Sequence, residues 1–165
     1  MEPLKVVAQL WERIEVLDWD GAALLIAEDA VIEWPVSSER IVGRDNFIAV
    51  ISDDDYADER SVDVLRILAD GDLVVTEVEI PQDHVVYRAV SLWTVRNGQI
   101  VGAREYWTSP GQDPAPRWRA GFVEPLVEPL AASLAADRAD SGQPLGATGP
   151  GDWPGRPSRS AGLAN

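Results

Sequence analysis

Apolar residues in the N-terminal third of the chain recur at helical spacing, interrupted by one short run of strand character. Between residues 4 and 17 they return every three or four positions, which predicts an amphipathic helix. Asp20 is a suitable N-cap for a second helix rich in Ala and Leu. The expected helices span 4–17, 21–28 and 45–51, and the expected strands are 30–34, which Pro35 ends, and 41–42, which pairs back onto it.

From residue 62 the apolar positions alternate with polar ones, as in the strands of a half-buried sheet. Asp70-Gly71 and Asn97-Gly98 are strong hairpin-turn sequences, and 81–83 has the composition of a turn. Helices followed by a meander of strands predict an α+β domain with its helices on one face of the sheet. The expected strands span 62–68, 73–80, 85–95 and 99–108.

Gly and Pro become frequent near residue 137, and the apolar periodicity ends there. Ten of the 29 residues over 137–165 are Gly or Pro, which is typical of a segment with too little apolar area to offset the entropy of ordering. We therefore expect a globular domain over 1–136, with a core over 4–110 and a C-terminal extension over 111–136, and a disordered tail over 137–165. A last helix is expected at 128–136.

The chain is acidic, with 28 Asp or Glu against 14 Lys or Arg and a formal net charge of −14. Such a charge repels the phosphates of nucleic acids, and no basic stretch offsets it. No apolar run reaches the roughly 20 residues needed to cross a bilayer. The first residues also lack the apolar core of a secretory signal. We therefore expect a cytoplasmic protein that binds neither nucleic acid nor membrane.

Metal and cofactor chemistry find no support in the sequence. The chain has no cysteine, so disulfides and thiolate sites are excluded. His84 is the single histidine, which leaves no multi-histidine metal site, and no Gly-x-Ser-x-Gly motif accompanies it for a serine triad. The acidic run 53–59 lacks the glycine and terminal glutamate of an EF-hand loop, so a solvated loop is expected. With no glycine-rich phosphate loop, we expect no cofactor.

Several short motifs stand in a defined order along the chain. They are Asp18-Trp19-Asp20, Glu33-Trp34-Pro35, Gly43-Arg44, Asn97-Gly98-Gln99-Ile100 and Glu105-Tyr106-Trp107. In this order, residues 4–110 resemble the nuclear transport factor 2-like superfamily, and within it the SnoaL-like group, which includes polyketide cyclases and is related to the ketosteroid isomerases. The resemblance implies a strongly curved, mainly antiparallel sheet, closed by the N-terminal helices into a cone with an apolar pocket. It also implies a homodimer.

The same resemblance tests one catalytic mechanism. Ketosteroid isomerases carry a proton-shuttling aspartate just before the proline that ends the first strand, where this chain has Trp34. Their protonated aspartate corresponds to Ser91 or Val90, and their tyrosine on the first helix has no counterpart. The resemblance therefore argues against this mechanism, although Trp107 matches a tryptophan that faces the ligand cavity in that group.

Tryptophan is unusually frequent, with seven Trp against two Phe and three Tyr. Strand alternation puts Trp107 on the face of Glu105, and Trp93 shares that face if Ser91 is the inward position of the family. Aromatic rings on one face suit a planar or polycyclic ligand; the alternative is that they only fill the core. The expected ligand-binding residues are Trp34, Ser91, Trp93 and Trp107.

Glu105 is the candidate acid or base. A carboxyl group in a dry aromatic pocket has a raised pKa, which suits proton transfer near neutral pH; the alternative is a salt bridge on the sheet surface. Glu77 and Glu79 alternate with apolar residues and are expected on a solvated face. The residues expected to be structural are Trp11 and Trp118 in packing, Asp20 as a cap, and Arg44 in an ion pair with Asp18 or Glu33.

Three functional hypotheses follow from these observations. The first is binding of a small apolar or polycyclic molecule in a tryptophan-lined pocket. The second is a cofactor-independent isomerase or cyclase that uses Glu105 to move a proton. The third is a dimeric module whose curved sheet binds a partner protein, and it requires an exposed apolar face on the sheet.

Overall fold

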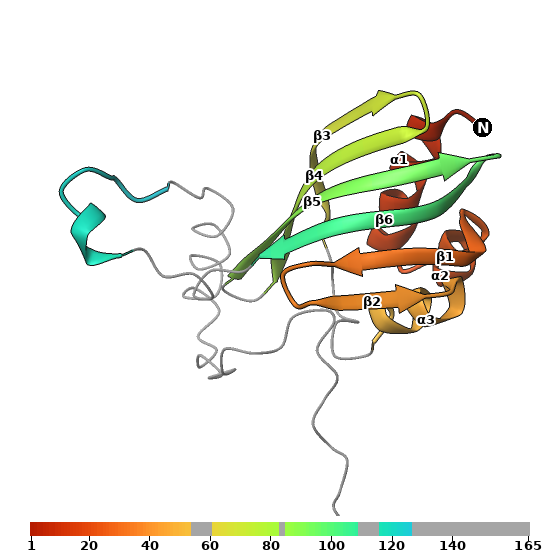
Figure 1. Cartoon of the computed structure of the whole chain (residues 1–165), viewed down its shortest axis with the longest axis horizontal. Helices are drawn as coiled ribbons and strands as arrows, with labels where there is room; N and C mark the ends of the chain where they lie inside the picture. The colour runs from red at the N-terminus through yellow and green to blue at the C-terminus, as the bar shows by residue number, and fades with distance from the viewer. Residues whose placement is uncertain (54–60, 83–84, 109–115, 127–165) are drawn as a thin grey trace, which may run out of the picture.

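The computed structural model describes residues 1–53, 61–82, 85–108 and 116–126 (Figure 1). The expected tail, the helix at 128–136 and His84 lie outside the described residues, as does most of the acidic run. The elements are α1 (Pro3–Glu15), α2 (Trp19–Leu24), β1 (Ile26–Trp34), β2 (Glu39–Val42), α3 (Arg44–Ile51), β3 (Asp63–Asp70), β4 (Leu73–Gln82), β5 (Val85–Arg96), β6 (Gln99–Thr108) and the 3-10 helix η2 (Arg117–Arg119).

The strands form one sheet in the order β2-β1-β6-β5-β4-β3. Neighbouring strands are antiparallel except β1 and β6, which run parallel. The sheet does not close, because β2 and β3 remain its two edges. α1 crosses one face and contacts β3, β4, β5 and β6, while α2 and α3 lie near β1 (Figure 1). The predicted α+β fold with a curved, mainly antiparallel sheet is confirmed.

The two predicted hairpin turns join the strands of the meander. Asn97 and Gly98 both have positive φ, 51° and 77°, as a two-residue turn between twisted strands requires. Gly71 has φ 59° in the Asp70-Gly71 turn. Since Gly and Asn tolerate this conformation best, these residues set the end of β3 and the start of β4, and the end of β5 and the start of β6.

The core lies between α1 and the inner face of the sheet. α1 starts with Pro3 in its first turn and turns one apolar stripe toward the sheet. The buried residues of that stripe are Val6, Val7, Leu10, Trp11 and Ile14. Alternation along β4, β5 and β6 supplies the opposite wall, so the helical and strand periods read from the sequence meet in one core.

The junction after α1 differs from the expectation. α2 begins at Trp19, and its N-cap is Asp18 rather than Asp20: the Gly21 N–H donates to Asp18 Oδ1 at 2.9 Å. That hydrogen bond, with the neighbouring Arg13 guanidinium, holds the pKa of Asp18 below its usual range. The helix predicted to reach residue 28 ends at Leu24, so the second half of that prediction is wrong.

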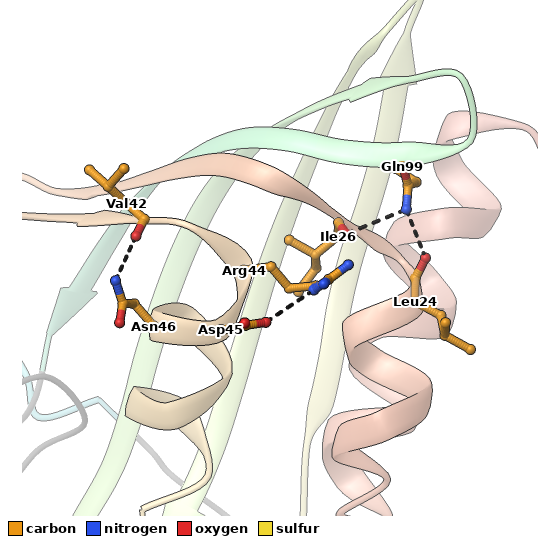
Figure 2. A network of polar contacts seen from close by, with 7 residues as sticks. All are labelled: Leu24, Ile26, Val42, Arg44, Asp45, Asn46 and Gln99. Carbon is orange, nitrogen blue, oxygen red and sulfur yellow. Dashed lines mark hydrogen bonds and ion pairs between the residues drawn. The ribbon is translucent and has the colours of Figure 1, made fainter.

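The second helix ends early because the residues after it belong to β1, which pairs with β6. β1 starts at Ile26, four residues before the expected strand, because Ile26 pairs with Ile100 at the start of β6. The Gln99 side chain strengthens this end: its Nε2 donates to the carbonyl oxygens of Leu24 at 3.2 Å and of Ile26 at 3.4 Å (Figure 2). A parallel partner far away in the sequence thus overrides the local helical preference of this Ala- and Leu-rich segment.

Two further expectations are corrected. The turn predicted at 81–83 begins later, because β4 continues to Gln82 and Pro81 pairs with Val86. Pro81 is tolerated there because, among the described residues, β3 pairs with β4 only as far as Glu79, so the proline interrupts no ladder between these two strands. Trp118 does not pack in the core: it is 74% exposed, with the Arg119 guanidinium 6.0 Å from its ring.

None of the described helices is both long and apolar enough to cross a bilayer.

We expect Asp18→Ala to lower the thermal unfolding midpoint by a few degrees, because it removes the α2 cap and the ion pair with Arg13. Asp18→Asn should recover most of the loss, since an amide oxygen can still accept from Gly21. Asp20→Ala is the matched control and should change the midpoint little. An equal loss in the Asp18→Ala and Asp20→Ala variants in a calorimetric scan would contradict this assignment of the cap.

Candidate functional site

The inner face of β5 and β6 carries the site residues predicted from the sequence. Cross-strand pairs place Ser91 opposite Glu105, Ala89 opposite Trp107, and Trp93 opposite Ala103. All six side chains are buried. The predicted alternation is therefore correct, and Ser91, Trp93, Glu105 and Trp107 share one face.

Trp34 reaches the same face from β1. Glu33 pairs in parallel with Arg104, so these two side chains point outward and their successors, Trp34 and Glu105, point inward. The Trp34 Nε1–H donates to Glu105 Oε2 at 2.8 Å. Outside, the Arg104 guanidinium lies 3.3 Å from the Glu33 carboxylate. Each strand thus contributes one charged residue to the surface and one side chain to the interior.

Glu105 is buried, with 2% of the residue exposed, and both carboxyl oxygens accept hydrogen bonds. Oε2 accepts from Trp34, and Oε1 accepts from the Ser91 hydroxyl at 3.0 Å. The alternative of a surface salt bridge is wrong, because the nearest arginine in sequence, Arg104, occupies the opposite face. The three groups come from β1, β5 and β6, so the sheet register itself sets their geometry.

Burial raises the pKa of Glu105 above its ordinary value of 4.5. Removing a carboxylate from water disfavours its charged form, and this is the largest effect. The hydrogen bonds from Trp34 and Ser91 and the Trp107 side chain favour the charged form and oppose the rise. Glu105 therefore holds its proton to higher pH than a glutamate in water does.

Trp11 joins these rings from α1, on the other side of the core. Its ring centroid lies 5.8 Å from that of Trp93 and 6.4 Å from that of Trp107, both in edge-to-face geometry. Trp93 in turn donates from Nε1 to the Thr76 hydroxyl of β4 at 2.9 Å. We call the set of Trp11, Trp34, Ser91, Trp93, Glu105 and Trp107 the inner cluster.

Sequence reasoning missed two members of this environment. Thr76 faces inward between Val74 and Val78, and the alternation of β4 was a sufficient signal to place it there. Trp11 was expected to pack only, and it does pack, but its contacts connect the helix to the two interior strands. Nothing in helical periodicity indicates which rings of the opposite layer a side chain will meet.

Other predicted polar contacts differ. Arg44 pairs with neither Asp18 nor Glu33: its Nε lies 3.3 Å from Asp45 in the first turn of α3 (Figure 2). Asp18 forms its ion pair with Arg13 at the end of α1, and Glu33 forms its ion pair with Arg104 on the neighbouring strand. Beside Arg44, the Asn46 amide donates to the Val42 carbonyl oxygen at 2.8 Å (Figure 2).

The outer face of the sheet carries the expected solvated glutamates, each beside an arginine of the next strand. Glu77 lies 3.4 Å from Arg66, and Glu79 lies 2.9 Å from Arg88. Within the described ranges, no group of three His, Asp or Glu side chains is close enough to hold a metal ion. On the inner face, the geometry places the Glu105 carboxyl group, a proton donor or acceptor and hydrogen-bonding group, among aromatic rings.

Comparisons with known proteins agree with this architecture. A model of the SnoaL-like domain matches residues 7–103, more than half of the chain. Comparison with curated protein sequences finds no match.

Solved structures give further matches. An NTF-2 like protein of unknown function from Burkholderia xenovorans is 29% identical with a TM-score of 0.60, over 74% of this chain and 94% of that one. A candidate ketosteroid isomerase from Kribbella flavida is 25% identical with a TM-score of 0.65, over 78% and 92%. IdmH, a candidate polyketide cyclase from Streptomyces antibioticus, is 22% identical with a TM-score of 0.58, over 67% and 93%, which shows the shared fold. The chain belongs to the SnoaL-like domain family, within the NTF2-like fold.

Proposed function

We propose that the protein binds a small apolar or polycyclic molecule among the tryptophans of the inner cluster, with Glu105 as the polar group that meets it. The observation that carries this proposal is the burial of Glu105. Within the described ranges it is the only ionisable side chain in the buried core, where the other buried polar side chains are Thr76 and Ser91.

A carboxyl group in this place is costly for folding. Its transfer from water disfavours the charged form, and a Gln or Leu of similar size would satisfy the core at lower cost. Perturbed carboxyl groups of this kind gather where proteins bind or transform ligands. The surrounding indole rings supply flat apolar surface that suits a planar ligand.

A second function at the same site is catalysis without a cofactor, as an isomerase or cyclase. The raised pKa of Glu105 favours it, because a carboxyl group that holds its proton more firmly than an ordinary glutamate is a stronger base when ionised. Such a group could remove a proton next to a ligand carbonyl and return it elsewhere on the molecule. The resemblance to candidate isomerases and cyclases supports the same class of chemistry.

The roles of the residues differ from those in ketosteroid isomerases. Trp34 stands where those enzymes carry the shuttling aspartate, and it donates to the carboxyl group of Glu105 instead. Ser91 is one of the two positions that match their protonated aspartate, and it also donates to Glu105. In our proposal one carboxyl group on β6 carries the proton chemistry that two carboxyl groups share in those enzymes.

We also propose that the outer face of the sheet pairs two copies of the chain. Apolar side chains are exposed on it, including Leu68 at 66%, Val90 at 44% and Tyr106 at 40%. Two copies of a chain with a net charge of −14 repel each other. On this face, however, cross-strand ion pairs balance the glutamates with Arg66, Arg88 and Arg104, so it is the face on which two copies can approach.

The protonation of Glu105 predicts a pH dependence of stability. The folded pKa lies above the unfolded value of about 4.5, so between the two the native state binds more protons and the free energy of unfolding falls as pH rises. Glu105→Gln should remove this slope, which is at most about 1.4 kcal/mol per pH unit. At pH values above the folded pKa of Glu105, the variant should be more stable than the parent. Urea unfolding across the pH range measures it. Glu77→Gln, half exposed on the outer face, is the control, and an unchanged slope in Glu105→Gln would show that Glu105 titrates normally.

The catalytic proposal predicts proton exchange with a suitable carbon acid. With 1-tetralone in D2O, the protein should accelerate exchange of the hydrogens next to the carbonyl, followed by proton NMR. Glu105→Gln should lower the accelerated rate by about 100-fold or more and leave the affinity for 1-tetralone nearly unchanged. Glu33→Gln, on the outer face, should behave like the parent. Equal exchange in the parent and Glu105→Gln would remove the enzyme hypothesis and leave the binding proposal in place.

The pairing proposal predicts the mass in solution. Light scattering should give twice the mass of one chain for the parent protein. Tyr106→Asp should give a single chain mass, because it adds two like charges to the centre of the joined faces. Leu24→Asp adds the same charge to α2, where Leu24 is 75% exposed, and should remain dimeric. A single chain mass for the parent would contradict the proposal.

A further inference from the structure

Trp11 has a buried indole N–H whose hydrogen-bonding capacity is unused within the described part of the chain. The residue is 3% exposed, and its Nε1–H makes no hydrogen bond to any of the described residues. The N–H groups of Trp34 and Trp93 are committed to Glu105 and Thr76. A buried donor without an acceptor is costly, so native cores seldom contain one without a reason.

The place of this donor is informative. Trp11 comes from α1, the layer opposite the sheet, while Glu105 comes from β6. The Trp11 ring touches Trp93 and Trp107, whose residues flank Ser91 and Glu105 on the inner face. A ligand held among these rings would therefore meet a hydrogen-bonding group from each of the two layers.

We infer that the Trp11 N–H donates a hydrogen bond to the bound ligand, and that the ligand is a planar ring system with two oxygen functions, one meeting Glu105 and the other meeting Trp11. The inference rests on the proposed binding function and names the class of ligand for it. It excludes pure hydrocarbons and compounds with a single oxygen as the preferred ligands. A site built to hydrogen-bond an oxygen discriminates against the analogue without it, because its own donor is then left unpaired.

The structure contains an alternative use for this donor. The Trp11 ring meets Trp93 at an interplanar angle of 83° and Trp107 at 61°, so the N–H could be directed at an aromatic face. In that case the donor stabilises the fold of the empty protein and contributes nothing to ligand choice. Stability and ligand preference therefore separate the two uses.

Three bicyclic probes of similar shape test the inference: tetralin, 1-tetralone and 5-hydroxy-1-tetralone, which carry none, one and two oxygen atoms, the two on opposite edges. Affinities are measured by titration calorimetry for the parent and for Trp11→Phe. The parent should bind 5-hydroxy-1-tetralone about 10-fold more tightly than 1-tetralone. Trp11→Phe should bind 5-hydroxy-1-tetralone and 1-tetralone with nearly equal affinity, whatever the smaller ring does to the binding of all three probes. A gain that persists in Trp11→Phe would overturn the inference while leaving the binding proposal intact.

Failure of the binding proposal looks different: none of the three probes would bind to either protein, and the inference would fall with it. Trp93→Phe is the matched control for loss of ring size. It should lower stability more than Trp11→Phe does, because it strands the Thr76 hydroxyl that Trp93 now bonds. Equal losses of stability would point to a structural use of the Trp11 N–H and would overturn the inference.

A measurement on the parent protein guards against a variant that does not fold. With indole nitrogen labelled, the Trp11 N–H resonance should move downfield on addition of 5-hydroxy-1-tetralone, as a new hydrogen bond requires. Tetralin should not produce this shift, and the Trp93 resonance should remain nearly in place because its bond to Thr76 is already formed. The same small shift of Trp11 with both probes would contradict the inference.

Discussion

The hydrogen bonds to the Glu105 carboxyl group join three strands that are far apart in the sequence. Trp34 ends β1, Ser91 lies in the middle of β5, and Glu105 lies on β6. Their contact requires the parallel register of β1 on β6 and the antiparallel register of β5 on β6 at the same time. A shift of either register by one residue would turn Glu105 or its donors to the outer face. The hydrogen bonds to the buried carboxyl group therefore form only in this strand register, and they stabilise that register.

This dependence explains which features could be predicted from the sequence. β6 was predicted with its observed bounds, 99–108, because the Asn97-Gly98 turn and strict alternation are local signals. The inward placement of Glu105 with Trp107 follows from the same alternation. The early start of β1 was missed, because the end of a parallel strand takes its limits from a distant partner, Ile100. The cap at Asp18 was missed because Asp20, two residues later, has the same capping side chain. The hydrogen bond from Trp34 to Glu105 was also missed, because it joins two strands that are far apart in the sequence.

The adjacent residues Arg104 and Glu105 show how one strand serves two environments. Arg104 points outward and is matched by Glu33, a partner in register on β1. Glu105 points inward, and the groups that favour its charged form there are neutral: the side chains of Trp34, Ser91 and Trp107. Neutral donors stabilise a carboxylate less than an arginine does, so desolvation prevails and the pKa rises. An arginine in place of Ser91 would favour the charged form of Glu105 and lower its pKa.

The two layers of the core differ in how their indole N–H groups are hydrogen-bonded. On the sheet, the indole donors of Trp34 and Trp93 are already committed to Glu105 and Thr76, so the sheet holds its own polar groups in fixed positions. On the helix, the Trp11 donor is buried without such a partner among the described residues. In our proposal, Glu105 would set the position of a ligand on the sheet, and Trp11 on α1 would fix its orientation. Among the described residues no backbone hydrogen bond joins α1 to the sheet, so side-chain packing sets the position of Trp11, whereas strand register sets the position of Glu105.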